Sequence, residues 1–143
     1  MDNSQKTSVM IIENDDDFRS LLNGVFERSD SFELHGSFGS IEEFSVALLQ
    51  QKPVTDWIPH LMVVDVMSSD DPRTESASYM SALRSEGMTF ATLFVSSMEF
   101  GALIRVLRRS HPIGWAALQK TSQLTEQKII ESAIAVCGEM NSK

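Results

Sequence analysis

The sequence predicts an α/β protein with a doubly wound (βα)5 sandwich, in which helices cover both faces of a five-stranded parallel sheet. Short apolar runs alternate along the chain with longer stretches whose apolar residues recur at helical spacing. This strand-then-helix alternation occurs five times. The apolar runs are unbroken, which is typical of strands that are buried on both faces.

The first two strand and helix units are predicted before residue 50. Residues 9–12 form the first strand, and an amphipathic helix follows them. Residues 32–37 form a weaker second strand. Ser40 and Glu43 form a capping-box pattern, which predicts that the next helix begins there. The apolar residues at helical spacing are Phe18, Leu21, Leu22, Val25 and Phe26 in the first helix, and Ile41, Phe44 and Leu48 in the second.

The remaining units follow a longer connection. Residues 50–60 contain two prolines and are expected to form a surface loop within the domain. Residues 61–64 form the third strand. The helix after it, at about residues 76–85, is expected to end at Gly87, because glycine favours the C-cap of a helix. Further along are a strand at 92–95, a helix from Phe100 that Pro112 ends, a short strand at 115–118 and a last helix at 124–136.

Length and composition limit the classes of function. The 143 residues fit one domain, predicted over residues 1–143 with a core at about 8–138. A net charge of −8 argues against nucleic acid as a partner of this chain, because affinity for phosphates depends on clustered Lys and Arg. The sequence has neither an apolar signal segment nor an apolar run near the length of about 18 residues that spans a membrane. We therefore expect a cytoplasmic protein without a membrane partner.

Polar residues follow the predicted strands where each one ends. An acidic run from Glu13 follows the first strand, Asp65 the third, Ser96 and Ser97 the fourth, and Lys120 the fifth. Each of these alone could be a solvated turn, a helix N-cap or a surface lysine. In a doubly wound sheet, however, the carboxyl ends of the strands border the functional crevice. The coincidence at one edge of the sheet favours a shared site.

Over nearly its whole length the chain resembles the receiver domain of two-component response regulators, which has a flavodoxin-like (CheY-like) fold. The resemblance is carried by the acidic cluster after VMII with Arg19 following, by PHLMVVD ending on Asp65, by LFVSS ending on two serines, and by LQK ending on Lys120. No single motif is specific. The order and spacing of the four motifs fit the family.

The resemblance implies a role for each matching residue. Asp65 would accept a phosphoryl group from a histidine kinase or phosphotransfer protein, Ser96 would bind that group, and Lys120 would pair with Asp65 or its phosphate. Such a domain catalyses its own phosphoryl transfer and dephosphorylation and signals by conformational change, rather than acting as a conventional enzyme. The implied ligands of Mg²⁺ or Mn²⁺ are Glu13, Asn14, Asp65 and the backbone carbonyl of Met67.

Two positions at the predicted site, Asn14 and Ala117, depart from the family's pattern. Asn14 stands where a second acid is usual, so metal binding is expected to be weaker; Asp15 is the next acid, but alternation along an extended segment points it the other way. Ala117 replaces the aromatic residue that often lies three residues before the lysine. Trp115 lies on the same strand face, and we expect it to pack against the last helix.

Two methionines bear on the lifetime of a phosphoryl group at Asp65. By the same resemblance, Met67 and Met98 flank the path of the attacking water. Both side chains are apolar and neither can act as a base, so the sequence predicts slower dephosphorylation than in receivers with acids or amides at these positions. The alternative is that both methionines turn away and pack elsewhere.

Other readings of the sequence remain open. A pseudo-receiver would keep the fold as a phosphorylation-independent protein-binding module, and Asn14, Ala117 and the irregular segment after Asp65 favour it. A haloacid-dehalogenase-type phosphatase would need a second aspartate where the chain has Met67.

Basic residues gather in the helix Phe100–Ser110, which contains Arg105, Arg108 and Arg109. They form either a solvated face or a surface for a homodimer or an output partner.

Overall fold

A single parallel sheet organises the chain in the computed structural model, which describes residues 6–51, 54–66, 75–110 and 114–141. Five strands follow the order β2-β1-β3-β4-β5, which confirms the predicted fold class. The strands are β1 (Thr7–Ile12), β2 (Phe32–Phe38), β3 (Leu61–Asp65), β4 (Ala91–Ser96) and β5 (Trp115–Gln119). The helices are α1 (Asp16–Glu27), α2 (Ile41–Leu49), α3 (Val54–Trp57), α4 (Glu75–Ser85), α5 (Phe100–Ser110) and α6 (Glu126–Asn141).

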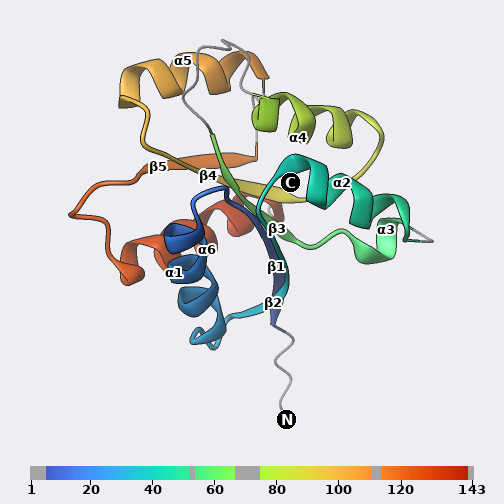
Figure 1. Ribbon diagram of the computed structural model, residues 1–143, viewed down its shortest axis with the longest axis horizontal. Coiled ribbons are helices and arrows are strands. Elements are labelled where there is room, and N and C mark those ends of the chain that lie inside the picture. The colour runs from blue at the N-terminus through green and yellow to red at the C-terminus, as the bar shows by residue number, and fades with distance from the viewer. Residues whose placement is uncertain (1–5, 52–53, 67–74, 111–113, 142–143) are drawn as a thin grey trace.

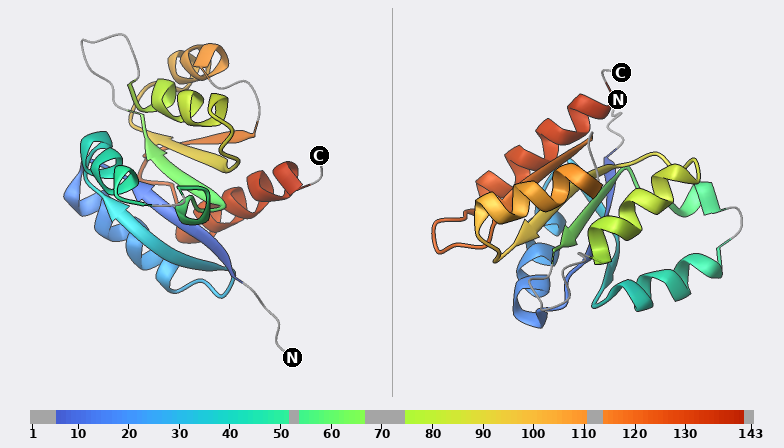
Figure 2. Two further views of the ribbon diagram at one scale, coloured as in Figure 1. Left: turned by 90° about the vertical axis from the view of Figure 1, so that its right-hand side faces the viewer. Right: turned by 90° about the horizontal axis from the view of Figure 1, so that it is seen from above.

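Helices lie on both sides of the sheet, α1 and α6 on one side and α2, α4 and α5 on the other (Figures 1 and 2). Alternate residues of each strand point to opposite sides, so the sheet contributes to two apolar clusters. The first cluster joins Val9, Ile11, Val63, Leu93 and Val95 of the sheet to Leu22 and Phe26 of α1 and to Ile129 and Ala133 of α6. The second joins Met10, Met62, Val64 and Phe94 to Phe44 of α2, Met80 of α4 and Leu103 of α5.

The register of the sheet brings several strand ends to one edge. β3 lies between β1 and β4, and every one of its residues is buried. Its pairing with β1 ends at Ile12 opposite Val64, so Glu13 and Asp65 each come directly after the last paired residue. On the other side Ser96 of β4 pairs with Gln119 of β5, directly before Lys120. The parallel strands therefore deliver these polar residues to the same edge.

Two predicted helix ends are confirmed. Ser40 accepts a hydrogen bond from the backbone N–H of Glu43 at 3.1 Å, and the Glu43 carboxylate accepts one from the N–H of Gly39 at 2.8 Å. The capping box is thus displaced by one residue, because Glu43 reaches past the N-cap itself. After α4, Gly87 has a φ of 98°, the left-handed conformation that glycine adopts without strain.

The structure corrects two predictions, one for the connection at residues 50–60 and one for Leu21 of α1. The expected loop at residues 50–60 contains the short helix α3, whose Trp57 packs on the second cluster. In α1, Leu21 was assigned to the apolar face but is 49% exposed, because the buried stripe runs through its neighbours Leu22, Val25 and Phe26.

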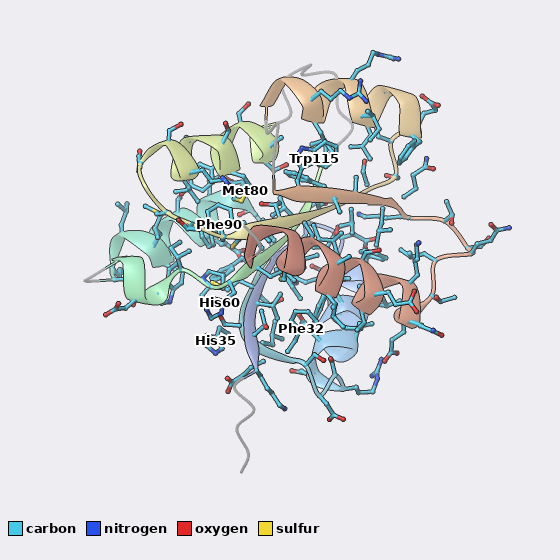
Figure 3. The ribbon with its side chains drawn as sticks, turned by 180° about the vertical axis from the view of Figure 1, so that it is seen from behind. Phe32, His35, His60, Met80, Phe90 and Trp115 are labelled. Atoms are coloured by element: carbon cyan, nitrogen blue, oxygen red, sulfur yellow. The ribbon has the colours of Figure 1, made fainter. Side chains whose placement is uncertain are left out.

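The expected packing of Trp115 against the last helix is wrong. Along β5, Trp115 and Ala117 belong to the second cluster, whereas Ala116 and Leu118 belong to the first cluster, which α6 covers. The Trp115 ring lies 6.5 Å from the ring of Phe94, and Figure 3 shows the side chain between β5 and α5. Alternation along the strand therefore turns Trp115 toward α5.

No helix within the described ranges is long and apolar enough to cross a bilayer.

Candidate functional site

Glu13, Asp65 and Lys120 meet at the carboxyl edge of the sheet. The Lys120 Nζ donates a hydrogen bond to Glu13 Oε2 at 2.8 Å and lies 3.1 Å from Asp65 Oδ1. The Glu13 side chain is fully buried, and those of Asp65 and Lys120 are 7% and 15% exposed. One ammonium group thus bridges two buried carboxylates that are far apart in the sequence.

Backbone hydrogen bonds hold these three residues in place. The N–H of Glu13 donates to the carbonyl of Phe38 in β2 at 2.9 Å, and the N–H of Lys120 donates to the carbonyl of Ser96 at 2.8 Å. Asp65 is the last residue of β3, and the next N–H along the chain, that of Val66, donates to Val95 at 2.9 Å. The sheet itself therefore fixes the site.

Ser96, rather than its neighbour Ser97, lies at the site. Its hydroxyl is fully buried, donates to the carbonyl of Val66 at 2.9 Å and accepts from the N–H of Met98 at 2.9 Å. Ser97 is exposed. The Ser96 hydroxyl contacts the residue directly after Asp65, within the region that the sequence predicts for it.

Burial and neighbouring charges shift the pKa values of Glu13 and Lys120. Burial raises the pKa of Glu13, the hydrogen bond from Lys120 lowers it, and the charge of Asp65 raises it again, so the result is above the usual value. For Lys120, burial alone would lower the pKa, but the hydrogen bond to Glu13 and the charges of both carboxylates raise it above its usual value. Lys120 is therefore an ammonium ion at neutral pH.

No protein-family model and no curated protein sequence matches the chain, but solved structures do. The CheY-like receiver domain protein from Methanospirillum hungatei JF-1 has a TM-score of 0.69 and 13% identity, with 96% of this chain and 98% of that chain covered. The receiver domain of the putative response regulator NarL from Mycobacterium tuberculosis has a TM-score of 0.67 and 16% identity, with 94% and 98% covered. The receiver domain of a modulated diguanylate cyclase from Desulfovibrio desulfuricans G20 has a TM-score of 0.68 and 20% identity, with 96% and 98% covered.

The fold is that of a receiver domain. At 20% identity or below, the similarity establishes the fold and not the chemistry, because one fold hosts many functions. The receiver fold places Glu13, Asp65, Ser96 and Lys120 together, as the sequence predicts for a shared site. Met67, the predicted carbonyl ligand, lies outside the described residues.

Carboxylate and amide oxygens are the ligands that a hard cation such as Mg²⁺ prefers, and Glu13, Asn14 and Asp65 carry such oxygens. Glu13 Oε1 is buried and has no hydrogen-bond partner in the described part of the chain, while Oε2 accepts from Lys120 and from the N–H of Asp15. Asn14 is exposed beside it. Asp15 caps α1 by accepting from the N–H of Asp17 at 3.1 Å, so its side chain serves the helix. The described residues hold no group of three or more His, Cys, Asp or Glu side chains suited to a metal, which leaves few charged ligands.

Substituting Asn14 with aspartate is expected to tighten Mg²⁺ or Mn²⁺ binding roughly tenfold, because a carboxylate adds a charge worth about 1.4 kcal/mol beside the cation. Titration of the metal, followed by calorimetry or by fluorescence, measures the change. Ser20→Asp is the control, since it adds the same charge on an exposed position of α1. Equal affinity of Asn14→Asp and the unmodified protein would show that Asn14 does not limit metal binding.

Sequence reasoning missed three contacts of the site. The Arg19 guanidinium donates to the Glu13 carbonyl at 2.9 Å, and the Phe18 ring centroid lies 4.8 Å from Lys120 Nζ. Ser76 of α4 donates to the Asp65 carbonyl at 2.8 Å. Arg19 lies two residues after the acidic cluster, which is a usable signal. Phe18 was assigned only to the apolar face of its helix. Nothing in the sequence singles out Ser76 from the other serines of α4.

Proposed function

We propose that the chain is a receiver domain of a two-component response regulator or phosphorelay, in which Asp65 accepts a phosphoryl group from a histidine kinase or phosphotransfer protein. One observation carries the proposal: the Lys120 ammonium lies 3.1 Å from a nearly buried Asp65 carboxylate and 2.8 Å from the buried Glu13. A carboxylate at the end of a buried strand needs such a counter-ion. The receiver fold supports the same assignment.

The proposed step is a phosphoryl transfer between two nucleophiles. A carboxylate oxygen of Asp65 attacks phosphorus, a new P–O bond forms, and the P–N bond of the phosphohistidine breaks. The electron pair of that bond stays with the imidazole nitrogen, and the ring holds or takes up one proton so that it ends as neutral imidazole. Lys120 neutralises charge on the transferred oxygens, and Ser96 donates its hydroxyl proton to one of them. A divalent cation held by Glu13, Asn14 and Asp65 would supply further charge neutralisation.

The test is incubation with acetyl phosphate and Mg²⁺, followed by mass spectrometry of the intact protein. We expect one added phosphoryl group on the unmodified chain and none on Asp65→Asn. Asp56→Asn, which changes an exposed aspartate of α3, is the control and should be labelled like the unmodified chain. Labelling of Asp65→Asn at the unmodified rate would overturn the proposal.

The second candidate is a pseudo-receiver, a protein-binding module that works without phosphorylation. The uncharged Asn14 favours it, because one acid fewer is present to hold the cation. The same experiment separates the candidates, since a pseudo-receiver gains no phosphoryl group even with saturating Mg²⁺.

The phosphoryl group is expected to survive long on Asp65. Met98 is half-buried and packs on the second cluster beside Ser96, where it offers no base or hydrogen bond to a water molecule. Replacing both methionines, as Met67→Asn with Met98→Glu, should shorten the lifetime about tenfold, by admitting and orienting water. Phosphate release after removal of the donor measures it.

The control for that experiment is Met88→Glu, because Met88 packs on the same cluster but precedes β4, whereas Met98 follows it. Equal lifetimes in the double variant and the unmodified protein would show that the methionines do not shield the phosphoryl group.

The surface of α5 is proposed to bind an output partner or a second copy of the chain. Arg105 and Arg108 are exposed on this helix, in a chain whose net charge is −8; the Arg109 side chain lies outside the described residues. Replacing Arg105 and Arg108 with glutamate is expected to weaken self-association of the phosphorylated protein severalfold, as measured by sedimentation equilibrium. If this face of α5 only contacts solvent, the double variant and the unmodified protein should give the same sedimentation equilibrium.

A further inference from the structure

Two serine hydroxyls hold the end of β3, and they come from different elements. Ser96 at the end of β4 donates to the carbonyl of Val66, and Ser76 in the first turn of α4 donates to the carbonyl of Asp65. Both hydroxyls are buried, with Ser76 only 6% exposed. Consecutive carbonyls at and after the proposed phosphoacceptor are thus fixed by side chains.

Asp65 still pairs with Val95 of β4, but its pairing with β1 has ended, and its carbonyl takes a hydrogen bond from a side chain. The pairing of β3 with β1 stops at Val64 opposite Ile12, so Asp65 lies beyond the last residue that β1 pairs with. A buried carbonyl without a donor is unfavourable. Ser76 provides the donor at 2.8 Å.

The hydroxyl of Ser76 does not act as a helix cap. A capping hydroxyl lies just before a helix and accepts a hydrogen bond from a free N–H of the first turn. Ser76 is instead the second residue of α4 (Glu75–Ser85), and its hydroxyl donates to a strand residue eleven positions earlier. Its bond therefore serves β3 rather than its own helix.

The donor belongs to a helix that is anchored in the core. The residues of α4 that follow Ser76 on its inner side, Ala77 and Met80, are fully buried in the second cluster. Figure 3 shows Met80 on the inner side of this helix. A donor on an anchored helix holds a reacting group more tightly than one on a loop.

We propose that Ser76 is a positioning residue for the reaction at Asp65, an inference that rests on the proposed function. Ser76 fixes the peptide group between Asp65 and Val66, and with it the direction in which the Asp65 carboxylate leaves the backbone. Lys120 holds the same residue from its carboxylate end, 3.1 Å from Oδ1. With both ends held, the carboxylate is aligned for attack before the donor arrives.

The test compares rates of phosphorylation by acetyl phosphate over a range of donor concentrations. Ser76→Ala is expected to lower the maximal rate about tenfold, within the range that a small misplacement of a reacting group produces, and to leave the half-saturating donor concentration unchanged. Ser76→Thr keeps the hydroxyl and should stay within about twofold of the unmodified rate. Ser78→Ala, which changes an exposed serine of the same helix, should have no effect.

Two further measurements separate positioning from stability. A purely structural role would lower the denaturation midpoint of Ser76→Ala but leave its maximal rate equal to that of Ser78→Ala, and this result would overturn the inference. If Ser76→Ala does not fold, Ser76→Cys decides, since its thiol is similar in size but a weaker donor; an unmodified rate in that variant would also overturn the inference. If the unmodified protein itself gains no phosphoryl group, the proposed function fails, and the inference with it.

Discussion

Replacing Lys120 with alanine is expected to lower the free energy of unfolding by about 3 kcal/mol and to abolish phosphorylation of Asp65. The substitution leaves the buried carboxylates of Glu13 and Asp65 at the same edge without the ammonium that lies within 3.1 Å of both. An unpaired charge in such surroundings is far more costly than the loss of a surface ion pair. Chemical denaturation and labelling by acetyl phosphate measure the two effects separately.

Lys128→Ala is the matched control, because Lys128 is exposed in α6 and should change stability by less than about 0.5 kcal/mol. Acidification gives an independent check. The pKa of Glu13 is raised, so the folded chain binds a proton there more tightly than the unfolded chain does. Lys120 lowers that pKa, so Glu13 takes up its proton at a higher pH in Lys120→Ala than in the unmodified protein, and the loss of stability should shrink as the pH falls and this proton binds. Equal losses for Lys120→Ala and Lys128→Ala at pH 7 would refute the ion-pair assignment.

Replacing Ser96 with alanine is expected to cost about 2 kcal/mol of stability, because one buried and one partly buried backbone group then lose their partner. These groups are the carbonyl of Val66 and the N–H of Met98, each 2.9 Å from the Ser96 hydroxyl. The variant should also lose the hydroxyl that contacts the transferred phosphoryl group, so phosphorylation of Asp65 should slow as well. Urea denaturation and the labelling rate test both expectations.

The neighbouring Ser97 supplies the control for Ser96. Ser97 is exposed, so Ser97→Ala should be neutral within about 0.5 kcal/mol. Ser96→Thr, which retains a hydroxyl, should recover most of the lost stability. If Ser96→Ala proved as stable as Ser97→Ala, the two hydrogen bonds would carry no net energy.

The sequence was sufficient to predict the centre of the sheet because its three central strands, β1, β3 and β4, are buried on both faces. Runs such as LMVV at residues 61–64 contain no polar residue, and the structure buries all of β3. Parallel strands end at a common edge, so the order of polar residues after each run was enough to bring Asp65 and Lys120 together. These predictions depend only on local pattern and on the direction of the chain.

Other features depend on long-range geometry that no local pattern contains. The pairing of β5 with β4 decides which residues of β5 face which helix layer. This pairing turns Trp115 toward α5. The bond from Ser76 to Asp65 joins residues eleven positions apart through the packing of α4. For the same reason the ring of Phe18 was predicted as core packing, although it also lies 4.8 Å from the Lys120 ammonium.

The place of Trp115 also determines what can be observed optically in this protein. The chain has two tryptophans, and both pack on the second cluster, Trp115 near Phe94 beneath α5 and Trp57 near Phe38 and Phe44. The opposite layer, formed by α1 and α6, has no indole against it in the described residues. Intrinsic fluorescence therefore reports repacking of α2, α3 and α5 directly, whereas movements of α1 and α6 leave both emitters in unchanged surroundings.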